Sequence, residues 1–208
     1  MATEIDWSSI GGKRENGAKF IKFSAGKTVR VRPVGRVVTF CKFFVQTPNG
    51  NRSVCVDMEN KEEAATLLCD YTGKEIIPQE RFAINVIDRE DGEIKILEGG
   101  KSIFGAFSHW AKKTGSDPGG QGGGDWSIAA TGEGKLRRYQ PNHLKHTQVS
   151  EEEKNAVIAA AKERSLVEVF RAVPLDELIS KIFGEAGEPE PNQDAQSGNS
   201  ESDSLIGW

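Results

Sequence analysis

Hydrophobic and polar residues alternate with a period of two along much of the first quarter of the chain. This period is typical of β-strands that bury one face and expose the other. Four segments show it, at residues 19–24 (KFIKFS), 27–33 (KTVRVRP), 37–45 (VVTFCKFFV) and 52–56 (RSVCV). The short sequences AG, VG and PNGN lie between them and predict turns, the last of them a hairpin turn.

The middle of the chain adds two hairpins and two helices. RFAINVID and EIKILE flank REDG, and DWSIAAT and KLRRYQ flank GEG, so each pair predicts two antiparallel strands. Residues 60–71 and 101–113 have helical patterns. Residues 115–124 contain six glycines and are expected to form a mobile loop. Short strands, tight turns and a mid-chain helix favour a mainly β fold with added helices, arranged as an OB-fold-like Greek-key β-barrel.

Beyond residue 149 the strand patterns give way to helical ones. Ser150 and Glu153 have the spacing of a capping box for a helix over residues 151–164. Pro174 is suited to the first position of a second helix, which Gly184 is expected to end.

We therefore expect four parts along the chain. Residues 1–18 are predicted to be a flexible arm, residues 19–149 an OB-fold core that binds nucleic acid, and residues 150–184 a helical extension. Residues 185–208 are rich in Pro, Glu, Asn, Gln and Ser and are expected to be disordered. The longest apolar run, AVIAAA, is too short for a membrane span, and the N-terminus lacks a signal-peptide pattern. We expect a protein of the cytoplasm, or of the host-cell cytoplasm if a phage encodes it, without membrane contact.

Charge is unevenly distributed along the chain. The 208 residues carry a formal net charge of −4, but residues 13–52 hold ten basic side chains and one acidic one. Residues 185–208 hold six acids and no cation, which leaves a net charge of +2 on the rest. Such segregation favours a polyanion-binding body with an acidic interaction tail.

Basic and aromatic residues are interleaved in the N-terminal strands and again at residues 135–146. Lys and Arg neutralise phosphates and exposed rings stack on unpaired bases, so this mixture favours binding of a single nucleic-acid strand. The ordinary alternative for each residue is a solvated cation or a core phenylalanine. The candidate nucleic-acid-binding residues are Lys27, Arg30, Arg32, Arg36, Lys42, Phe43, Phe44, Arg52, Lys101, Trp110, Lys112, Arg137, Arg138 and Tyr139.

Signals for metal binding and catalysis are weak. The chain has no HExxH, GxSxG or Walker loop and no CxxC pair, so we expect no catalytic residue, no cofactor and no metal site. Cys41, Cys55 and Cys69 are an odd number of widely spaced cysteines, which suits reduced thiols.

The order of several segments resembles a known family. RFAINVIDREDGEIKILEGGKSIFGAF, a glycine-rich gap, GDWSIAATGEGKLRRYQ and an acidic tail are similar to the single-stranded DNA-binding proteins of tailed bacteriophages, the helix-destabilising class with an OB-fold core. The resemblance covers roughly residues 19–140 and the tail, and NVIDREDGEIKILEGG is its most specific piece. It implies cooperative coating of single-stranded DNA during phage replication, recombination and repair. Members often carry a Cys-rich zinc insert before the segment matching RFAINVID. Only Cys55 and Cys69 stand there, so the zinc site is expected to be lost.

The end of the tail is similar to those of single-stranded DNA-binding proteins that finish with an aromatic residue. On this resemblance, Leu205, Ile206 and Trp208 are expected to bind replication or recombination proteins. The sequence leaves open whether chains self-associate on DNA. It also leaves open three other hypotheses: a single-stranded RNA binder, a protein-only adaptor whose basic face docks an acidic partner, and a nuclease that uses the acid-rich residues 57–98.

Overall fold

The computed structural model describes residues 19–120, 122–132, 136–144, 148–163 and 165–184. The expected arm and acidic tail, including Leu205, Ile206 and Trp208, lie outside these residues. Within the described chain, no helix combines the length and the apolar character that crossing a bilayer requires.

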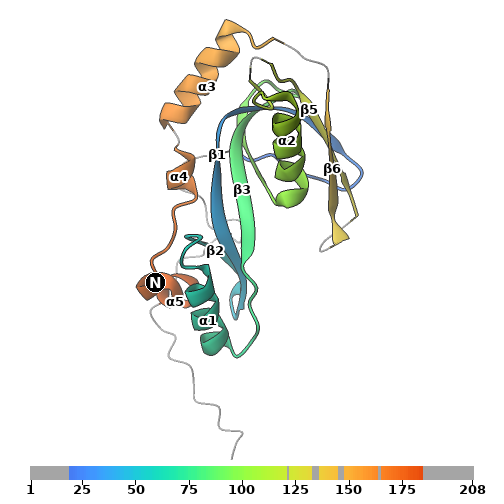
Figure 1. Cartoon of the computed structure of the whole chain (residues 1–208). Coiled ribbons are helices and arrows are strands. Elements are labelled where there is room, and N and C mark those ends of the chain that lie inside the picture. Colours follow the sequence, from blue (N-terminus) through green and yellow to red (C-terminus); the bar gives the residue numbers. More distant parts are fainter. Residues whose placement is uncertain (1–18, 121, 133–135, 145–147, 164, 185–208) are drawn as a thin grey trace, which may run out of the picture.

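The described chain forms a six-stranded antiparallel sheet and five α-helices, which confirms the predicted mainly β fold with added helices (Figure 1). The strands are β1 (Thr28–Thr47), β2 (Gly50–Val56), β3 (Gln79–Asp88), β4 (Ile94–Gly99), β5 (Trp126–Thr131) and β6 (Arg138–His143). The helices are α1 (Lys61–Thr72), α2 (Lys101–Thr114), α3 (Glu151–Glu163), α4 (Leu166–Val169) and α5 (Leu178–Phe183), with a 3-10 turn, η3 (Leu175–Glu177), before α5.

The sheet has the strand order β4-β3-β1-β5-β6, and β2 pairs with the second half of β1. It is not closed into a barrel, because no pairing joins β4 to β6 within the described residues. The free edge of β4 is taken instead by the segment before β1. The N–H of Ile21 donates to the carbonyl of Ile96 at 2.9 Å, and the N–H of Ile96 donates to the carbonyl of Lys19 at 2.8 Å.

Strand β1 is longer than the alternation predicted. The two expected strands at 27–33 and 37–45 are one continuous strand, and the turn predicted at Gly35 is wrong. The pairing with β3 shifts register between Val34 and Val38, and Gly35 has a φ of +80°, so the irregular sequence VGR forms a bulge. The bulge bends β1 without ending it.

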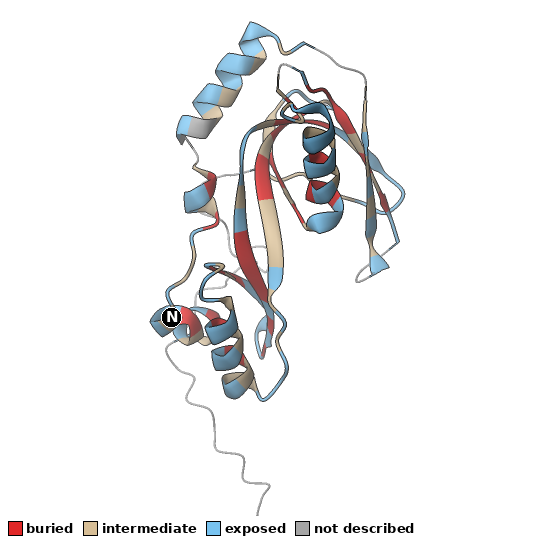
Figure 2. Ribbon diagram, viewed as in Figure 1, coloured by how far each residue is buried: buried red, intermediate tan, exposed pale blue. Residues whose placement is uncertain are grey.

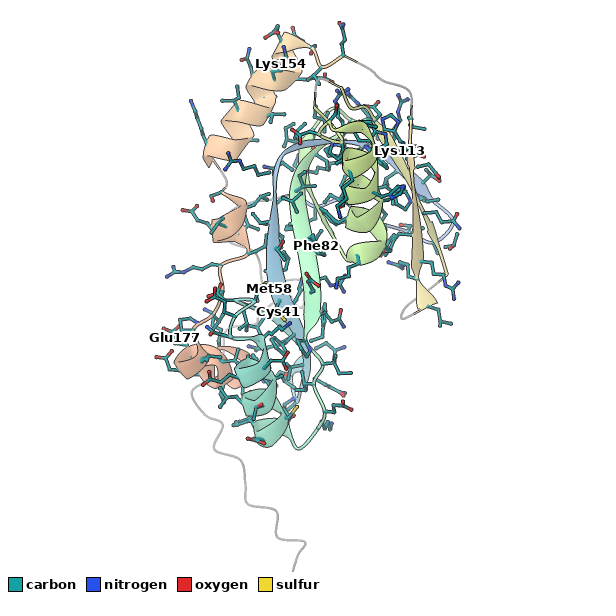
Figure 3. All side chains as sticks on the ribbon, in the orientation of Figure 1. Cys41, Met58, Phe82, Lys113, Lys154 and Glu177 are labelled. Atoms are coloured by element: carbon teal, nitrogen blue, oxygen red, sulfur yellow. The ribbon has the colours of Figure 1, made fainter. Side chains whose placement is uncertain are left out.

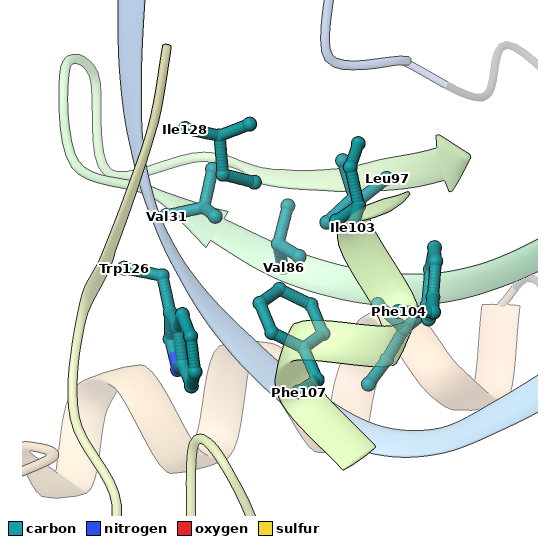
Figure 4. Close-up of a cluster of buried hydrophobic side chains, with 9 residues drawn as sticks. Val31, Val86, Leu97, Ile103, Phe104, Phe107, Trp126 and Ile128 are labelled. Carbon is teal, nitrogen blue, oxygen red and sulfur yellow. The ribbon is translucent and has the colours of Figure 1, made fainter. Parts of the chain in front are cut away.

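One of the two larger apolar cores lies between the sheet and helix α2. Val31, Val86 and Leu97 from three strands are buried there against Phe107 of α2 (Figure 4). Trp126 of β5 completes this layer, with its ring 4.6 Å from that of Phe107 in an edge-to-face arrangement. We call this side of the sheet the α2 face. Figure 2 shows buried residues concentrated on the central strands and on the side of α2 that meets them.

The opposite side of the sheet, which we call the outer face, follows from the strand registers. Successive residues of a strand point to opposite sides, and directly paired residues point to the same side. The outer face carries Arg30, Arg32, Phe40, Lys42 and Phe44 of β1, Arg81 and Ala83 of β3, and Ile96 and Glu98 of β4.

Residues 150–173 run along this outer face as far as the edge of β2 (Figure 1). The predicted capping box is confirmed: the Ser150 N–H donates to a Glu153 carboxylate oxygen at 2.9 Å, and the Glu153 N–H donates to Ser150 Oγ at 3.1 Å. Further on, Leu166 and Phe170 are buried in a small cluster on the sheet. The N–H of Val173 then donates to the carbonyl of Cys55 at 2.9 Å, at the edge of β2.

Helix α5 closes a separate core at the far end of β1. Leu178 and Ile182 pack with Leu68 of α1 and with Phe43 and Val45 of β1. The apolar side of this helix therefore faces a core, and Gly184 ends the helix as predicted.

The described residues of the glycine-rich segment form a packed loop, where a mobile loop was predicted. A Cβ atom on Gly119 would lie 1.7 Å from the carbonyl oxygen of Pro33, and one on Gly123 would lie 2.4 Å from that of Asp117. These glycines allow the loop backbone to touch β1 and to fold on itself. Trp126 Nε1 also donates to the carbonyl of Pro118 at 3.1 Å, which fixes the loop to β5.

Candidate nucleic-acid interface

Phe44 lies on the outer face with 47 % of its area exposed. Lys42 Nζ is 5.6 Å and the guanidinium carbon of Arg81 is 5.7 Å from the centroid of its ring. Cations within about 6 Å of a ring are attracted to its face. An exposed ring with two cations over it is suited to stack on a base and to hold the adjoining phosphates. We call Phe44, Lys42 and Arg81 the Phe44 patch.

Both cations of the Phe44 patch are positioned by neighbours. Lys42 Nζ donates to Glu98 Oε1 at 2.6 Å, and the pair is largely buried. An approaching phosphate would therefore compete with Glu98 for Lys42. One Arg81 amino group donates to Gln79 Oε1 at 2.7 Å, whereas the buried Nε of Arg81 has no hydrogen-bond partner in the described chain. Arg81 is therefore held by a neutral amide, so a phosphate that approaches it has no carboxylate to displace, in contrast to Lys42.

A cavity of about 1610 Å³ lies where β1 bulges, between the glycine-rich loop and helix α3. It exceeds the roughly 300–1,000 Å³ of small-molecule pockets, so its size suits a chain-like ligand. Val34, Val37 and Val157 supply apolar walls, and Arg36 and Lys154 supply exposed cations. Asp117 and Glu151 also line the cavity, and Glu151 pairs with Lys154. Figure 3 shows Lys154 on α3. We call this space the bulge cavity.

Asp125 is the centre of an arginine cluster beside the bulge cavity. Its carboxylate is 2 % exposed and accepts hydrogen bonds from Arg30 at 2.9 Å and from Arg89 Nε at 3.0 Å. Arg32 NH1 lies 3.9 Å from the same carboxylate. Arg89 also donates to Glu153, which joins helix α3 to the sheet.

The charges of this cluster shift one another's pKa values. Burial lowers the pKa of Arg32, which Asp125 counteracts only in part. Burial also disfavours the charged form of Arg89, but its hydrogen bonds to Glu153 and Asp125 outweigh this and raise the pKa of Arg89. Burial opposes ionisation of Glu153, yet the Ser150 N–H and Arg89 together hold its pKa below the ordinary value. The Arg89–Glu153 ion pair is therefore charged at neutral pH.

Arg32 was expected to contact a phosphate, but its side chain is completely buried and cannot reach one. Its Nε donates to the carbonyl of Gly119 at 2.9 Å, and NH2 donates to that of Gly120 at 3.0 Å. Arg32 thus clamps the glycine-rich loop onto β1. Arg30 shares its face of the strand as predicted, but its side chain stays 54 % exposed because the loop does not cover it.

Phe43 is also buried, in the core beneath α1 and α5, and therefore cannot stack on a base. It points away from Phe44 because neighbouring residues of a strand face opposite sides. Arg52 pairs in register with Val45, so it lies on the Phe43 side of the hairpin and apart from the Phe44 patch.

Four predicted residues gather at the end of the sheet formed by β5 and β6. Lys27 and Arg138 are exposed there. Arg137 NH1 donates to the carbonyl of Phe23 at 3.2 Å, and the ring of Tyr139 meets that of Phe23 edge to face at 4.9 Å. Arg137 and Tyr139 therefore fasten the segment before β1, which leaves Lys27 and Arg138 as the open cations of this group.

The predicted residues of helix α2 stand apart from the outer face. The Trp110 ring stacks on the His143 ring, with the two centroids 4.8 Å apart, and packs against the α2-face core. It is therefore already in contact with the protein and is not available to a base. Lys112 is exposed, and Lys101 pairs with Glu80 at 2.7 Å. The structure does not bring these three residues to the Phe44 patch.

Four residues on or beside the outer face were missed by the sequence interpretation: Phe40, Arg81, Arg89 and Lys154. Arg81 and Arg89 had a signal, since Arg81 is the first residue of the predicted strand RFAINVID and Arg89 directly follows it. Lys154 had none, because only the folded chain brings α3 to the bulge of β1.

Metal and nucleophile chemistry have little support in the described chain. Within it, no three or more His, Cys, Asp and Glu residues are grouped closely enough to hold a metal ion. Cys41, Cys55 and Cys69 are free thiols. Burial raises the pKa of Cys41, which makes its thiol less reactive.

Comparison with known proteins does not assign the chain. No protein-family model and no curated protein matches its sequence.

Proposed function

We propose that this protein binds single-stranded DNA without sequence preference and catalyses no reaction on it. The observation that carries the proposal is the Phe44 patch, an exposed ring with two cations over it, on a face that continues to the bulge cavity with Arg36 and Lys154. Rings that stack and cations that hold phosphates tolerate any base order, because neither reads the edge of a base.

We infer an OB fold from the order of the strands. β1, β3 and β4 form an antiparallel meander, α2 follows, and the β5–β6 hairpin pairs through β5 with the start of β1. This is the connectivity of a partly open five-stranded Greek-key barrel, which binds oligonucleotides across its second and third strands and between the loops that follow its first and fourth. The corresponding strands are β3 and β4, and the second of these loops is the β5–β6 turn beside Lys27 and Arg138.

The test is a titration of labelled oligonucleotides at several salt concentrations. If about six phosphates are contacted, affinity for single strands should fall roughly 300-fold between about 50 and 200 mM salt. Oligo-dT and mixed sequences should bind alike, and duplex DNA should bind more weakly. Stronger binding to duplex than to single strands, or no binding at low salt, would refute the proposal.

The same titration separates the remaining hypotheses. Tighter binding to an RNA oligonucleotide of the same sequence would indicate an RNA binder. Shortening of the oligonucleotide during incubation with magnesium would indicate a nuclease. A protein-only adaptor would bind neither strand.

We further propose that residues 185–208 compete with DNA and contact replication or recombination proteins through Leu205, Ile206 and Trp208. The support is compositional: six acids and no cation precede an apolar end. A tethered polyanion should weaken DNA binding most at low salt, where charges act over longer distances. Truncation after Gly184 should therefore raise affinity at low salt and change it little at high salt. Equal affinity of the two chains at low salt would contradict this.

A further inference from the structure

Two phenylalanines stack face to face on the outer face, and neither was among the candidate binding residues. The rings of Phe40 in β1 and Phe170 at the end of α4 have centroids 4.3 Å apart and planes 18° from parallel. Phe20 meets Phe170 edge-on at 6.2 Å. A near-parallel ring at this separation has the geometry that a nucleic-acid base adopts on an aromatic platform.

Phe40 is part of the same row as the Phe44 patch. It alternates with Lys42 and Phe44 along β1, so all three point to the outer face. Arg81, which lies over the Phe44 ring, is paired in register with Phe40. Without α4, the exposed surface would therefore run from Phe44 past Arg81 to Phe40 and on toward the bulge of β1.

We propose that Phe40 is a second base-stacking residue and that Phe170 occupies its place when no DNA is bound. On binding, α4 leaves the sheet and a base takes the position of the Phe170 ring. This inference rests on the proposed function. It adds Phe40 as a binding position and Phe170 as the residue that covers it.

The construction of the C-terminal segment suits such an exchange. Helix α4 is four residues long, and Val167 on it is 68 % exposed. Its contacts with the sheet cluster are apolar, through Leu166, Val169 and Phe170. The segment is fastened on both sides of α4, by Glu153 to Arg89 before it and by the Val173 N–H to Cys55 after it. The part between these two anchors can therefore lift while the rest of the fold stays in place.

The exchange replaces one aromatic stack by another, so the cost that it does not recover is the exposure of Leu166 and Val169, which is less than that of opening a core. A covered site lowers the apparent affinity by the fraction of molecules in which it is open. Weakening the Phe40–Phe170 stack should therefore tighten DNA binding, whereas weakening a stack that belongs to a permanent core should not.

The experiment combines hydrogen exchange of the full chain with matched variants. Addition of oligo-dT should speed amide exchange in residues 165–171 and slow it in residues 40–44. Phe170→Leu, which keeps an apolar side chain but removes the ring, should tighten oligo-dT binding by about two- to tenfold. Phe40→Leu should weaken it about fivefold or more. The control is Phe183→Leu, which removes a ring of the same segment that packs on Tyr71 at 4.5 Å and should leave affinity unchanged.

The outcomes separate this inference from the function on which it rests. If the wild-type chain binds single strands but residues 165–171 become protected, or if Phe170→Leu binds as wild type or more weakly, α4 is a fixed part of the fold and the inference is wrong. If the wild-type chain does not bind single strands at all, the proposed function fails first and the inference falls with it. Circular dichroism and thermal melting of each variant establish that it is folded.

Discussion

Helices α2 and α4 cover opposite faces of one sheet, and they do so in different ways. Helix α2 has fourteen residues and buries Ile103, Phe104 and Phe107 in a core that all of the central strands share. Helix α4 has four residues. Of the five buried residues in the cluster beneath it, only Leu166 and Phe170 come from α4 and its C-terminal end. The first cover completes the fold, whereas the second overlies a face that also carries an exposed ring and several cations.

The comparison teaches how a binding face can be distinguished from a core face when both are covered. Around α2 the buried side chains are apolar and interlocked. Around α4 the apolar contacts lie next to charged groups, with Lys42 and Arg81 on one side and Arg89 on the other. Displacing a cover of the second kind exposes a smaller apolar cluster, and that cluster lies next to charges that a polyanion can bind.

The largest expected effect distinguishes the two covers by stability. Phe107→Ala should lower the free energy of unfolding by about 3–5 kcal/mol, because it leaves a cavity between α2 and Trp126. Phe170→Ala should cost about 2 kcal/mol, because solvent can reach the space that it leaves. Urea denaturation of both variants measures the difference. Equal losses would mean that α4 is as integral to the fold as α2.

A second pair of variants tests whether the arginines of β1 have the different roles that their positions indicate. Arg32→Met should cost about 3 kcal/mol of stability, because it leaves the carbonyls of Gly119 and Gly120 buried without their donor. Arg36→Ala should change stability by less than about 0.5 kcal/mol and reduce the salt dependence of DNA binding by about 0.7, the value of one phosphate contact. A stable Arg32→Met chain with a reduced salt dependence would restore Arg32 as a phosphate contact.

The sequence predicted most elements of the fold, because the patterns that specify them are local. Alternation, turn residues and the Ser150–Glu153 capping box depend on neighbours within a few positions. It also placed Arg30 and Arg32 on one face of a strand, but their different burial depends on a loop that begins more than eighty positions later. The residues near Arg32 in the sequence give no sign of the loop that covers it. That loop can approach Arg32 because Gly119 has no side chain.

The same limit explains the bulge at Gly35 and the two phenylalanines at 43 and 44. Val-Gly is a turn signal in isolation, and only pairing with β3 on both sides carries the strand through it. Alternation shows that Phe43 and Phe44 face opposite ways, but not which of them meets α1 and α5. Alternation therefore places candidate residues on β1, while the parts of the proposed site that are covered become visible only in the tertiary structure.

The uncovered part of the outer face offers a test by binding alone. Phe44→Ala should weaken binding to oligo-dT by about 1–3 kcal/mol without changing the salt dependence, because it removes a stacking ring and no charge. The fold should hardly respond, since the ring is half exposed. Fluorescence anisotropy at three salt concentrations measures both quantities. If the folded variant binds like the wild type, the Phe44 patch is not a base-stacking site.

The smallest expected effect concerns the anchor that holds α3, and through it one end of the α4 segment, to the sheet. Glu153→Gln keeps a residue that serves in a capping box, so it isolates the ion pair with Arg89. The folded chain lowers the pKa of Glu153, so the charged form stabilises the fold at pH values above the ordinary carboxyl range. This stabilisation is lost as the pH falls through that range and then through the lowered pKa.

At pH 7 we therefore expect Glu153→Gln to be about 1 kcal/mol less stable than the wild type, with the gap closing as the pH falls below about 4. Urea melts at pH 7, 5, 4 and 3 follow the gap. Glu151→Gln is the matched control, because Glu151 lies in the same first turn but pairs only with the exposed Lys154. A gap for Glu153→Gln that stays constant with pH would show that the carboxylate charge does not hold α3. The fastening of the segment would then depend on its apolar contacts and on the Val173–Cys55 hydrogen bond.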